Sequence, residues 1–356
     1  MIDIFFQYIY SYPLLIMGVI FSEIVLFLIA VSFMKNHSIR SYHEIQKIHH
    51  GHTSRLGGLC IFLALFIGFV NRPFMVERQL IYDLFLCFTP VLLITTFEDF
   101  HFQIKPLYRL FAMIVASLLM VIFSLDRLPE LSIPVIQSVI NLPYILPIFY
   151  TIALIALMNG MNFIDGANGL LAVTAMGIFL GLSLMAYFIG DFDFLMVILL
   201  FFTPLIVFLI FNYPWGKIFM GDVGAYWFGW VLGVCIIYFF SKHDNLLTWS
   251  VPVLLFYPMM EVTFSIIRKV IQKKSPFEPD AHHLHLKIYF MSKRILNNHS
   301  RRANNIVMPA LTFFWLTPPV LAALFYSNLP LTLLSLGALI TIYISLYMMI
   351  PFEISD

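Results

Sequence analysis

Several short polar segments of this chain combine residue types that could hold phosphate groups and a divalent cation. Glu98 and Asp99 are adjacent at the end of an apolar run, and Asp222 lies between two glycines in the sequence GDVG. Carboxylate oxygens are the ligands that Mg²⁺ prefers, and a carboxylate can also take a proton from a nucleophile. The structural alternatives are an acidic pair neutralised by Lys105 or Arg109, and an aspartate that caps the helix it opens.

The segment NGMNFIDGANGL, residues 159–170, spaces its polar side chains three residues apart. Asn162, Asp165 and Asn168 therefore fall on one side of a helical turn, and the glycines between them allow a ligand to approach the backbone closely. The segment contains no Lys or Arg, so it offers Asp165 no local ion partner. The structural alternative is an Asx-rich turn between two helices, but the spacing favours a binding site.

Three histidines, His282, His283 and His285, stand in the sequence PDAHHLHL within a strongly basic segment, residues 268–304. In an extended chain the side chains of His283 and His285 point the same way. They could ligate a transition metal, donate to a phosphate group, or belong to a solvated basic loop. Because no cysteine is nearby, a structural zinc site is the least favoured reading, and we expect phosphate contact.

Two further residues could contact an anionic nucleotide. Arg55 precedes a Gly-Gly pair in TSRLGG, and Phe219, just before GDVG, could stack on a nucleobase. A Gly pair at the start of a helix more often serves close helix packing. Glu23 and Glu261 lie within apolar runs and have no motif around them.

The composition predicts that transmembrane helices position these residues. Hydrophobic residues make up 61% of the 356 residues and charged residues 11%, and the mean hydropathy is +0.92. A soluble domain carries about a quarter charged residues, so the composition excludes a soluble enzyme, a disordered chain and a disulfide scaffold. The net charge of +1 gives no field that would attract a nucleic acid. The three cysteines lie in apolar runs and are expected to be packing thiols.

The apolar runs predict an all-α, polytopic membrane protein with about eleven transmembrane helices in a single domain, residues 1–356. The expected spans are 8–34, 57–71, 80–97, 108–125, 144–160, 169–189, 194–211, 224–240, 247–267, 305–326 and 330–350. Sixteen of the twenty Lys and Arg residues fall on one side of these spans, which places the N-terminus outside and the C-terminus in the cytoplasm. The cytoplasmic catalytic loops are then 35–56, 98–107, 159–168, 212–223 and 268–304.

Taken in chain order, the Gly-Gly pair, the acidic pair, NFIDGANGL, FMGDVG and the histidine loop resemble the polyprenyl-phosphate N-acetylhexosamine-1-phosphate transferases, glycosyltransferase family 4. The resemblance covers roughly residues 50–290, and the PDxxHxH pattern favours the undecaprenyl-phosphate GlcNAc-1-phosphate branch. It implies a multi-pass enzyme of the bacterial inner membrane with its active site on the cytoplasmic face. Such an enzyme transfers HexNAc-1-phosphate from a UDP-N-acetylhexosamine to undecaprenyl phosphate and releases UMP. The lipid-linked product initiates O-antigen, lipopolysaccharide or other cell-envelope polysaccharides.

The resemblance also implies a cofactor, Mg²⁺ or in its place Mn²⁺, and roles for individual residues. Asp222 is similar to the family's Mg²⁺-binding aspartate. Glu98 and Asp99 match an acidic pair implicated in metal binding and in deprotonating the lipid phosphate, and Asp165 matches an aspartate beside the diphosphate. The resemblance leaves open whether Asp99 or Asp165 is the base. The residues expected against the nucleotide and the phosphates are Arg55, Asn162, Asn168, Phe219, His282, His283 and His285.

The chain departs from the family pattern at three positions: Glu98 replaces the usual Asp, Asn168 replaces a common Asp, and Ala281 stands where many relatives have Arg. These departures bear on substrate choice rather than on the reaction class. The first alternative to the enzyme is a transporter or flippase of lipid-linked intermediates. The second is a zinc enzyme that uses His283, His285 and Asp222. The oligomeric state, including a homodimer, stays open.

Overall fold

Helices form nearly the whole of the chain that the structure describes. The computed structural model describes residues 13–36, 53–70, 77–100, 104–124, 128–132, 137–273 and 282–351. Among these residues the only strand-like pairing is an isolated parallel bridge between Ser54 and Ile218. The expected all-α fold is therefore confirmed for the described ranges. The histidines within residues 37–52, and residues 279–281 of the histidine motif, lie outside them.

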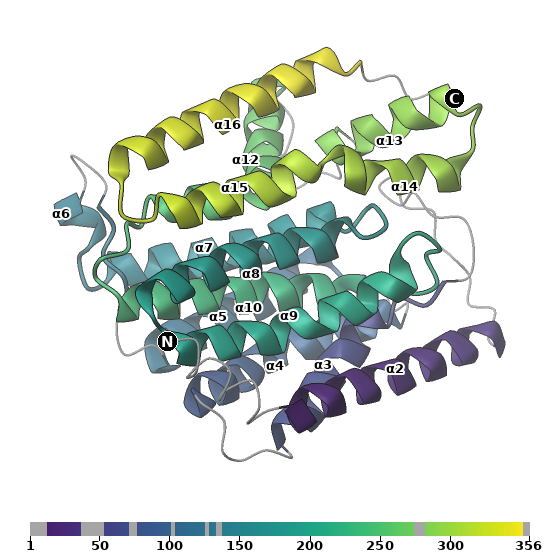
Figure 1. The fold of residues 1–356 in the computed structure, drawn as a ribbon, viewed down its shortest axis with the longest axis horizontal. Coiled ribbons are helices and arrows are strands. Elements are labelled where there is room, and N and C mark those ends of the chain that lie inside the picture. The colour runs from purple at the N-terminus through teal and green to yellow at the C-terminus, as the bar shows by residue number, and fades with distance from the viewer. Residues whose placement is uncertain are drawn as a thin grey trace.

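The helices follow the expected apolar runs along the chain (Figure 1). They are α2 (Pro13–Asn36), α3 (Gly57–Val70), α4 (Arg78–Asp99), α5 (Pro106–Leu119), the π-helical η1 (Met120–Ser124), α6 (Gln137–Ile140), α7 (Ile145–Ile164), α8 (Leu170–Ile189), α9 (Phe192–Asn212), α10 (Gly221–Lys242), α11 (Ser250–Leu254), α12 (Phe256–Ile271), α13 (Leu284–Ile295), α14 (Ser300–Ala310), α15 (Thr312–Leu324) and α16 (Leu329–Met349). In the described ranges, nine helical segments are long and apolar enough to cross a membrane.

In the part of the chain that the structure describes, two of the expected spans form no helix long enough to cross a membrane. The run 57–71 forms α3, whose 14 residues are fewer than a bilayer core requires. The run 247–267 breaks at Leu255 into α11 and α12. Proline lacks a backbone N–H, so Pro258 cannot bond to the carbonyl of Leu254, and this accounts for the break. The count of eleven spans and the orientation of the termini stay predictions.

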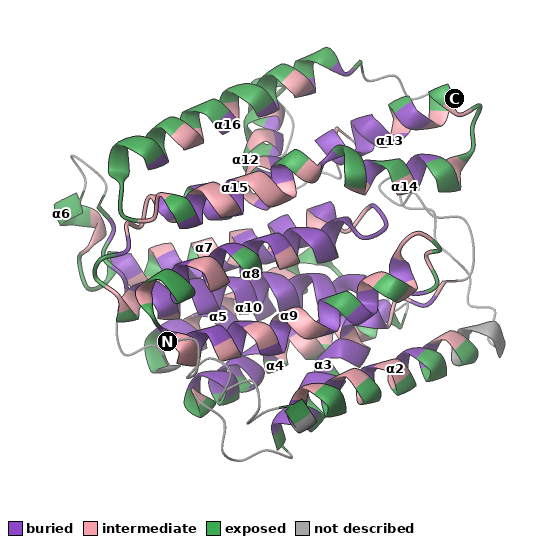
Figure 2. Cartoon of the chain, in the orientation of Figure 1, coloured by how far each residue is buried: buried purple, intermediate pink, exposed green. Residues whose placement is uncertain are grey.

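α10 lies at the centre of the bundle. Nearly all of its residues are buried, and it packs against α3, α4, α7 and α8. By contrast, α2 and α16 expose apolar side chains such as Phe21 and Met348 along their outer faces (Figure 2). Lipid tails are as apolar as these side chains, so such faces suit helices at the lipid boundary. The site described below is built on the first turn of the buried central helix.

Glycines allow α3 to approach α10 closely. A Cβ on Gly58 would collide with the backbone N and Cα of Gly224. The Gly-Gly pair of TSRLGG therefore serves helix packing, as its position at the start of a helix suggests. This contact brings the segment before α3 against the first turn of α10.

The polar motifs gather at one end of the bundle, on the right in Figure 1. α4, α7 and α9 end there, whereas α3, α8 and α10 begin there. Contacts between the motifs confirm this placement: Asp99 bonds to the first turn of α10, and Asn162 bonds to Tyr226. Residues at helix ends on one side of a membrane bundle can reach water-soluble and lipid-anchored substrates at the same time.

Candidate active site

Asp99 at the end of α4 caps α10, the helix that carries Asp222. Asp99 Oδ1 accepts the backbone N–H of Asp222 at 2.9 Å, and Oδ2 accepts that of Val223 at 3.0 Å. The first N–H groups of a helix have no partner within it, and the N-cap residue of α10, Met220, supplies no side-chain bond. Asp222 is thus not the cap of its own helix. Its carboxylate is left to face other groups.

Gly221 allows three segments to approach one another closely: the residues before α3, the end of α4 and the start of α10. Its φ of 74° lies in the left-handed region, which glycine adopts without strain. A Cβ at this position would collide with the carbonyl oxygen of Arg55 and would lie 2.7 Å from Asp99 Oδ2. The glycine before Asp222 therefore serves both backbone conformation and packing at the site.

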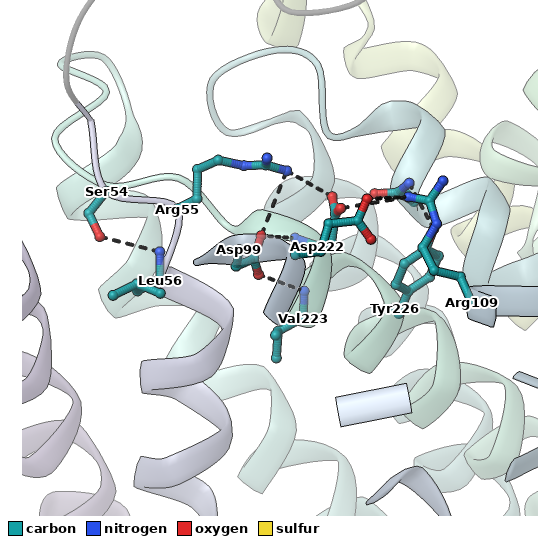
Figure 3. A network of polar contacts seen from close by, with 10 residues as sticks. Ser54, Arg55, Leu56, Asp99, Arg109, Asp222, Val223 and Tyr226 are labelled. Atoms are coloured by element: carbon teal, nitrogen blue, oxygen red, sulfur yellow. Dashed lines mark hydrogen bonds and ion pairs between the residues drawn. The ribbon is translucent and has the colours of Figure 1, made fainter. Parts of the chain in front are cut away.

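Arg55 and Arg109 hold Asp222 from two sides (Figure 3). Arg55 Nη2 lies 2.9 Å from Asp222 Oδ1 and 3.7 Å from Asp99 Oδ1. Arg109 Nη1 donates to Glu98 Oε1 at 3.0 Å and lies 3.8 Å from Asp222 Oδ2. Glu98 thus has the arginine partner named in the structural alternative, but the same arginine also reaches Asp222. Three carboxylates and two guanidinium groups thus form one cluster at the start of α10.

Backbone bonds hold Arg55 in place. The N–H of Phe219 donates to the carbonyl of Ser54 at 2.8 Å, and the N–H groups of Gly57 and Gly58 donate to the carbonyls of residues 219 and 220 at 3.0 and 2.7 Å. Arg55 and Phe219, two residues selected from the sequence, therefore lie on adjacent stretches of chain. The bonds fix both stretches against the first turn of α10.

The NFIDG motif joins the same end of the bundle through Asn162. Its Nδ2 donates to the hydroxyl of Tyr226, one turn after Asp222 on α10, at 3.2 Å. Asp165 follows at the C-terminal end of α7, and its backbone N–H donates to the carbonyl of Asn162. The two polar motifs, far apart in the sequence, are thus brought together by the packing of α7 on α10.

Asn168 is held by α14. Its backbone N–H donates to Asn304 Oδ1 at 2.8 Å, and its Nδ2 donates to Asn305 Oδ1 at 3.0 Å. The next residue, Gly169, donates its N–H to Asn212 Oδ1 at 2.6 Å. Asn168 is only 4% exposed, and among the described residues its Oδ1 has no hydrogen-bond partner. Its backbone N–H and Nδ2 bonds order the turn between α7 and α8, whatever it contributes to a nucleotide.

The histidine motif is anchored by a buried acid of α12. His283 Nδ1 lies 3.1 Å from Glu261 Oε2, and His285 Nδ1 lies 3.5 Å from Glu261 Oε1. The ring of His283 also contacts that of Phe163, next to Asn162 in α7, with ring centroids 5.2 Å apart. Burial lowers the pKa of His285 below its ordinary value, although the carboxylate of Glu261 acts in the opposite direction. The carbonyl of His282 accepts from Arg268 Nη1 at 2.8 Å.

Comparison with known proteins identifies the family. The sequence profile of glycosyl transferase family 4 matches residues 81–240. The chain is 31% identical over 242 residues to the undecaprenyl-phosphate alpha-N-acetylglucosaminyl 1-phosphate transferase of Thermotoga maritima, an alignment that covers 68% of this chain and 70% of that relative. The chain belongs to glycosyl transferase family 4. The resemblance found from the motifs, including its GlcNAc-1-phosphate branch, is confirmed.

Two further relatives agree with this membership. The chain is 23% identical over 244 residues to the Bacillus subtilis protein named "probable undecaprenyl-phosphate N-acetylglucosaminyl 1-phosphate transferase", across 68% of this chain and 67% of that protein. It is 26% identical over 266 residues to the phospho-N-acetylmuramoyl-pentapeptide-transferase of Petrotoga mobilis, across 68% and 79%. The protein is therefore a multi-pass membrane transferase of this family.

The residues of the cluster fit the divalent cation that the family implies. Carboxylate oxygens are the hard ligands that Mg²⁺ prefers, and Asp99 and Asp222 place two carboxylates side by side at the start of α10. In the described ranges, no group of three or more His, Cys, Asp or Glu side chains is close enough to form a complete metal cage. Mg²⁺ is commonly bound by one or two carboxylates together with substrate phosphates, so two carboxylates suffice. The described residues offer no support for the alternative of a zinc site.

Sequence reasoning missed several residues that build this site. Arg109 appeared only as a partner of Glu98, and Tyr226, Asn304 and Asn305 were not selected. The signal at Asn304 and Asn305 was an adjacent amide pair at the start of an expected span. Glu261 was noted as an acid without a motif; its partners are the histidines of a segment 22 residues further along the chain.

Proposed function

We propose that the protein transfers an N-acetylhexosamine 1-phosphate from a UDP-sugar to undecaprenyl phosphate, on the cytoplasmic face of the bacterial inner membrane. An oxygen of the lipid phosphate forms a bond to the sugar-bearing phosphorus. The bond between that phosphorus and the bridging diphosphate oxygen breaks, and UMP leaves. The product, a lipid-linked diphosphate sugar, initiates a cell-envelope polysaccharide such as O-antigen. The names of the relatives support the lipid acceptor and the transferred sugar.

The arrangement of Asp222 between two arginines is the observation that carries this proposal. Arg55 and Arg109 meet its carboxylate at the N-terminus of α10, whose first N–H groups are already bonded to Asp99. Both substrates bring anionic phosphates, so their approach requires positive charge at the point of transfer. One guanidinium group can bind two phosphate oxygens at once. A bound cation would replace the two arginines as the partner of the carboxylates, which frees the arginines for phosphate.

Each residue of the cluster then has a distinct task. Asp99 and Asp222 would hold Mg²⁺, which supplies charge neutralisation at the diphosphate when it is bound. Arg55 and Arg109 offset the repulsion between the two phosphate groups. Both oxygens of Asp99 already accept backbone N–H groups, which supports Asp165 rather than Asp99 as the base for the lipid phosphate. Phe219, on the stretch of chain bonded to the segment that carries Arg55, would stack on the uracil base.

The decisive experiment measures UMP release by the purified full chain in lipid nanodiscs. The reaction contains undecaprenyl phosphate, Mg²⁺ and one member of a panel of UDP-sugars that begins with UDP-GlcNAc. We expect release with at least one UDP-N-acetylhexosamine, loss of release with EDTA, and recovery with Mg²⁺ or Mn²⁺. Absence of UMP with every sugar of the panel would overturn the proposed function. The mass of the protein in the same nanodiscs tests whether it forms a homodimer.

Substitutions tie the activity to this site. Asp165→Asn and Asp222→Asn are each expected to reduce turnover about a hundredfold or more, because each removes a carboxylate assigned to the reaction. Asp193→Asn is the matched control: it makes the same change in the first turn of α9, at the opposite end of the bundle. Near-normal turnover in either site variant would remove that residue from the mechanism.

A further inference from the structure

One carboxylate, that of Glu261, is shared between two histidines. Its Oε2 lies 3.1 Å from Nδ1 of His283, and its Oε1 lies 3.5 Å from Nδ1 of His285. Glu261 is 1% exposed, and the two histidines are 3% and 1% exposed, so water competes little for these contacts. The contact with His283 is a hydrogen bond, whereas the contact with His285 is longer and falls outside hydrogen-bond geometry.

This contact decides which ring nitrogen carries hydrogen. An ionised carboxylate only accepts hydrogen bonds, so Nδ1 of His283 must be the protonated nitrogen, and the negative oxygen 3.5 Å from Nδ1 of His285 favours a proton there too. The other nitrogen, Nε2, is then the atom that each ring offers to a ligand. In this tautomer Nε2 carries a lone pair, so it accepts a hydrogen bond from a protonated phosphate oxygen, and it donates to an anion only after it has taken up a proton.

The two rings are parallel, which directs both Nε2 atoms the same way. The ring centroids of His283 and His285 are 5.5 Å apart, with an angle of 13° between the planes. Because both Nδ1 atoms face Glu261, both Nε2 atoms point away from it. The contact of His283 with Phe163 sets this pair beside the last turn of α7, which leads into Asp165.

Glu261 also fixes the helix that follows His283. The backbone N–H of Leu284, the first residue of α13, donates to Glu261 Oε2 at 3.3 Å, and the N-cap residue of α13 supplies no side-chain bond of its own. The acid of α12 therefore caps α13 and orients the two histidines at the same time. A test must separate these two effects.

We infer that Glu261 is a positioning residue: it holds His283 and His285 with Nδ1 protonated and Nε2 directed to the phosphate groups of the substrates. This inference rests on the proposed function for the identity of the ligand, a diphosphate or a lipid phosphate. The orientation of the rings can be measured without any substrate. The two ideas can therefore fail separately.

The first measurement is the protonation of the ring nitrogens in the wild-type protein. Histidine labelled with ¹⁵N is incorporated into the full chain in nanodiscs, and magic-angle-spinning NMR reads which nitrogen carries hydrogen. The variants His283→Gln and His285→Gln assign the two signals by their disappearance. We expect Nδ1 to be protonated in both rings. A ring with a bare Nδ1 at either position would overturn the inference, and this result requires no Glu261 variant to fold.

The second measurement uses Glu261→Gln. A carboxamide offers one oxygen and one NH₂ group where the carboxylate offers two oxygens, so one histidine must turn a bare Nδ1 to the new NH₂. We expect the signal of one ring to switch its protonated nitrogen, and kcat to fall about twentyfold with a smaller change in KM. Glu261→Asp keeps the charge but is one methylene shorter, and we expect it to retain the tautomers and an intermediate kcat.

The matched control is Glu23→Gln, since Glu23 is a buried glutamate of α2 that is 0% exposed. It should leave both histidine signals unchanged and kcat within about twofold of wild type. If Glu261→Gln lowers kcat while both tautomers stay as in the wild type, its role is structural and the inference is overturned. Wild-type kcat in that variant would overturn it as well. If the wild type releases no UMP from any UDP-sugar, the proposed function fails, and the NMR result still decides the orientation of the rings.

Discussion

The backbone N–H of Asp222 donates to Oδ1 of Asp99 at 2.9 Å, although 123 residues separate the two aspartates in the chain. The bond gives them different tasks. Asp99 accepts the N–H groups at the start of α10 with both oxygens, whereas Asp222 faces two arginines with both of its oxygens. A site assembled in this way depends on Asp99 for its shape as well as for the proposed cation, whereas Asp222 contributes to its chemistry alone.

The corresponding variants should separate shape from chemistry. Asp99→Asn turns an NH₂ group toward a backbone N–H, which leaves a buried donor unpaired, so we expect a stability loss of about 1–3 kcal/mol. Asp222→Asn is expected to keep the unfolding midpoint within a few degrees while turnover falls about a hundredfold. Thermal unfolding and UMP release, measured on the same preparations, test this. An equal loss of stability in both variants would contradict the division of tasks.

Gly221→Ala is expected to destabilise the protein at the site. The added Cβ meets the carbonyl of Arg55 and the carboxylate of Asp99, and φ is 74°. Gly190→Ala is the matched control, because Gly190 has a φ of 86° but no atom within 4 Å of an added Cβ. We expect both variants to lose about 1–2 kcal/mol from backbone strain, and Gly221→Ala to lose about 1–3 kcal/mol more from the clash. Equal unfolding midpoints would show that the clash is absent.

Local patterns in the sequence were enough to predict the helices and the polar end of the bundle. The apolar runs mark where helices begin and end, because burial in lipid demands long uninterrupted apolar stretches. The break at Leu255 was not predicted, since hydropathy alone does not register the missing N–H of Pro258. Which distant residues meet depends on how the helices pack and on which face each helix turns to its neighbour. The periodicity within one helix does not determine this packing.

The contacts of the site show the same difference between local contacts and contacts that depend on helix packing. Arg109 could be named as a possible partner of Glu98, in the structural alternative, and the two lie 11 residues apart on either side of one connection. The bond of Asn162 to Tyr226 spans 64 residues, and that of Asn168 to Asn305 spans 137. Partners at such distances follow from the packing of α7 and α14 against other helices. The family resemblance could select Asn162 and Asn168, but it did not identify their partners.

Asn304→Ala is expected to loosen the turn between α7 and α8. Asn304 is 2% exposed, and its Oδ1 is the partner of the Asn168 N–H. Its loss leaves a buried N–H unpaired, which costs about 1–3 kcal/mol. Asn305→Ala is the control: it removes the partner of the Asn168 side chain at a half-buried position, where water can replace the bond, so it should cost less. Unfolding midpoints and the KM for the UDP-sugar measure both effects; a larger loss for Asn305→Ala would refute this account.

Asp191, at the opposite end of the bundle, should make stability depend on pH. Its Oδ2 lies 2.8 Å from His243 Nε2 and 3.0 Å from Lys242 Nζ, and its Oδ1 accepts the N–H of Phe194 at 3.1 Å. Burial alone would raise the pKa of Asp191, but these bonds outweigh burial and hold the pKa below its ordinary value. A carboxylate with a lowered folded-state pKa contributes stability above its unfolded-state pKa and loses that contribution as the pH falls through the folded-state value.

We therefore expect Asp191→Asn to lower the unfolding midpoint at neutral pH. The difference from wild type should begin to shrink as the pH falls below the ordinary pKa of 3.8, because Asp191 of the unfolded chain is then protonated and folding must release that proton. Asp193→Asn makes the same change two residues further along and should show no such pH-dependent difference. Unfolding midpoints measured from about pH 7 to about pH 3 test this. A difference between Asp191→Asn and wild type that stays constant over this range would mean that the charge of Asp191 does not stabilise the turn between α8 and α9.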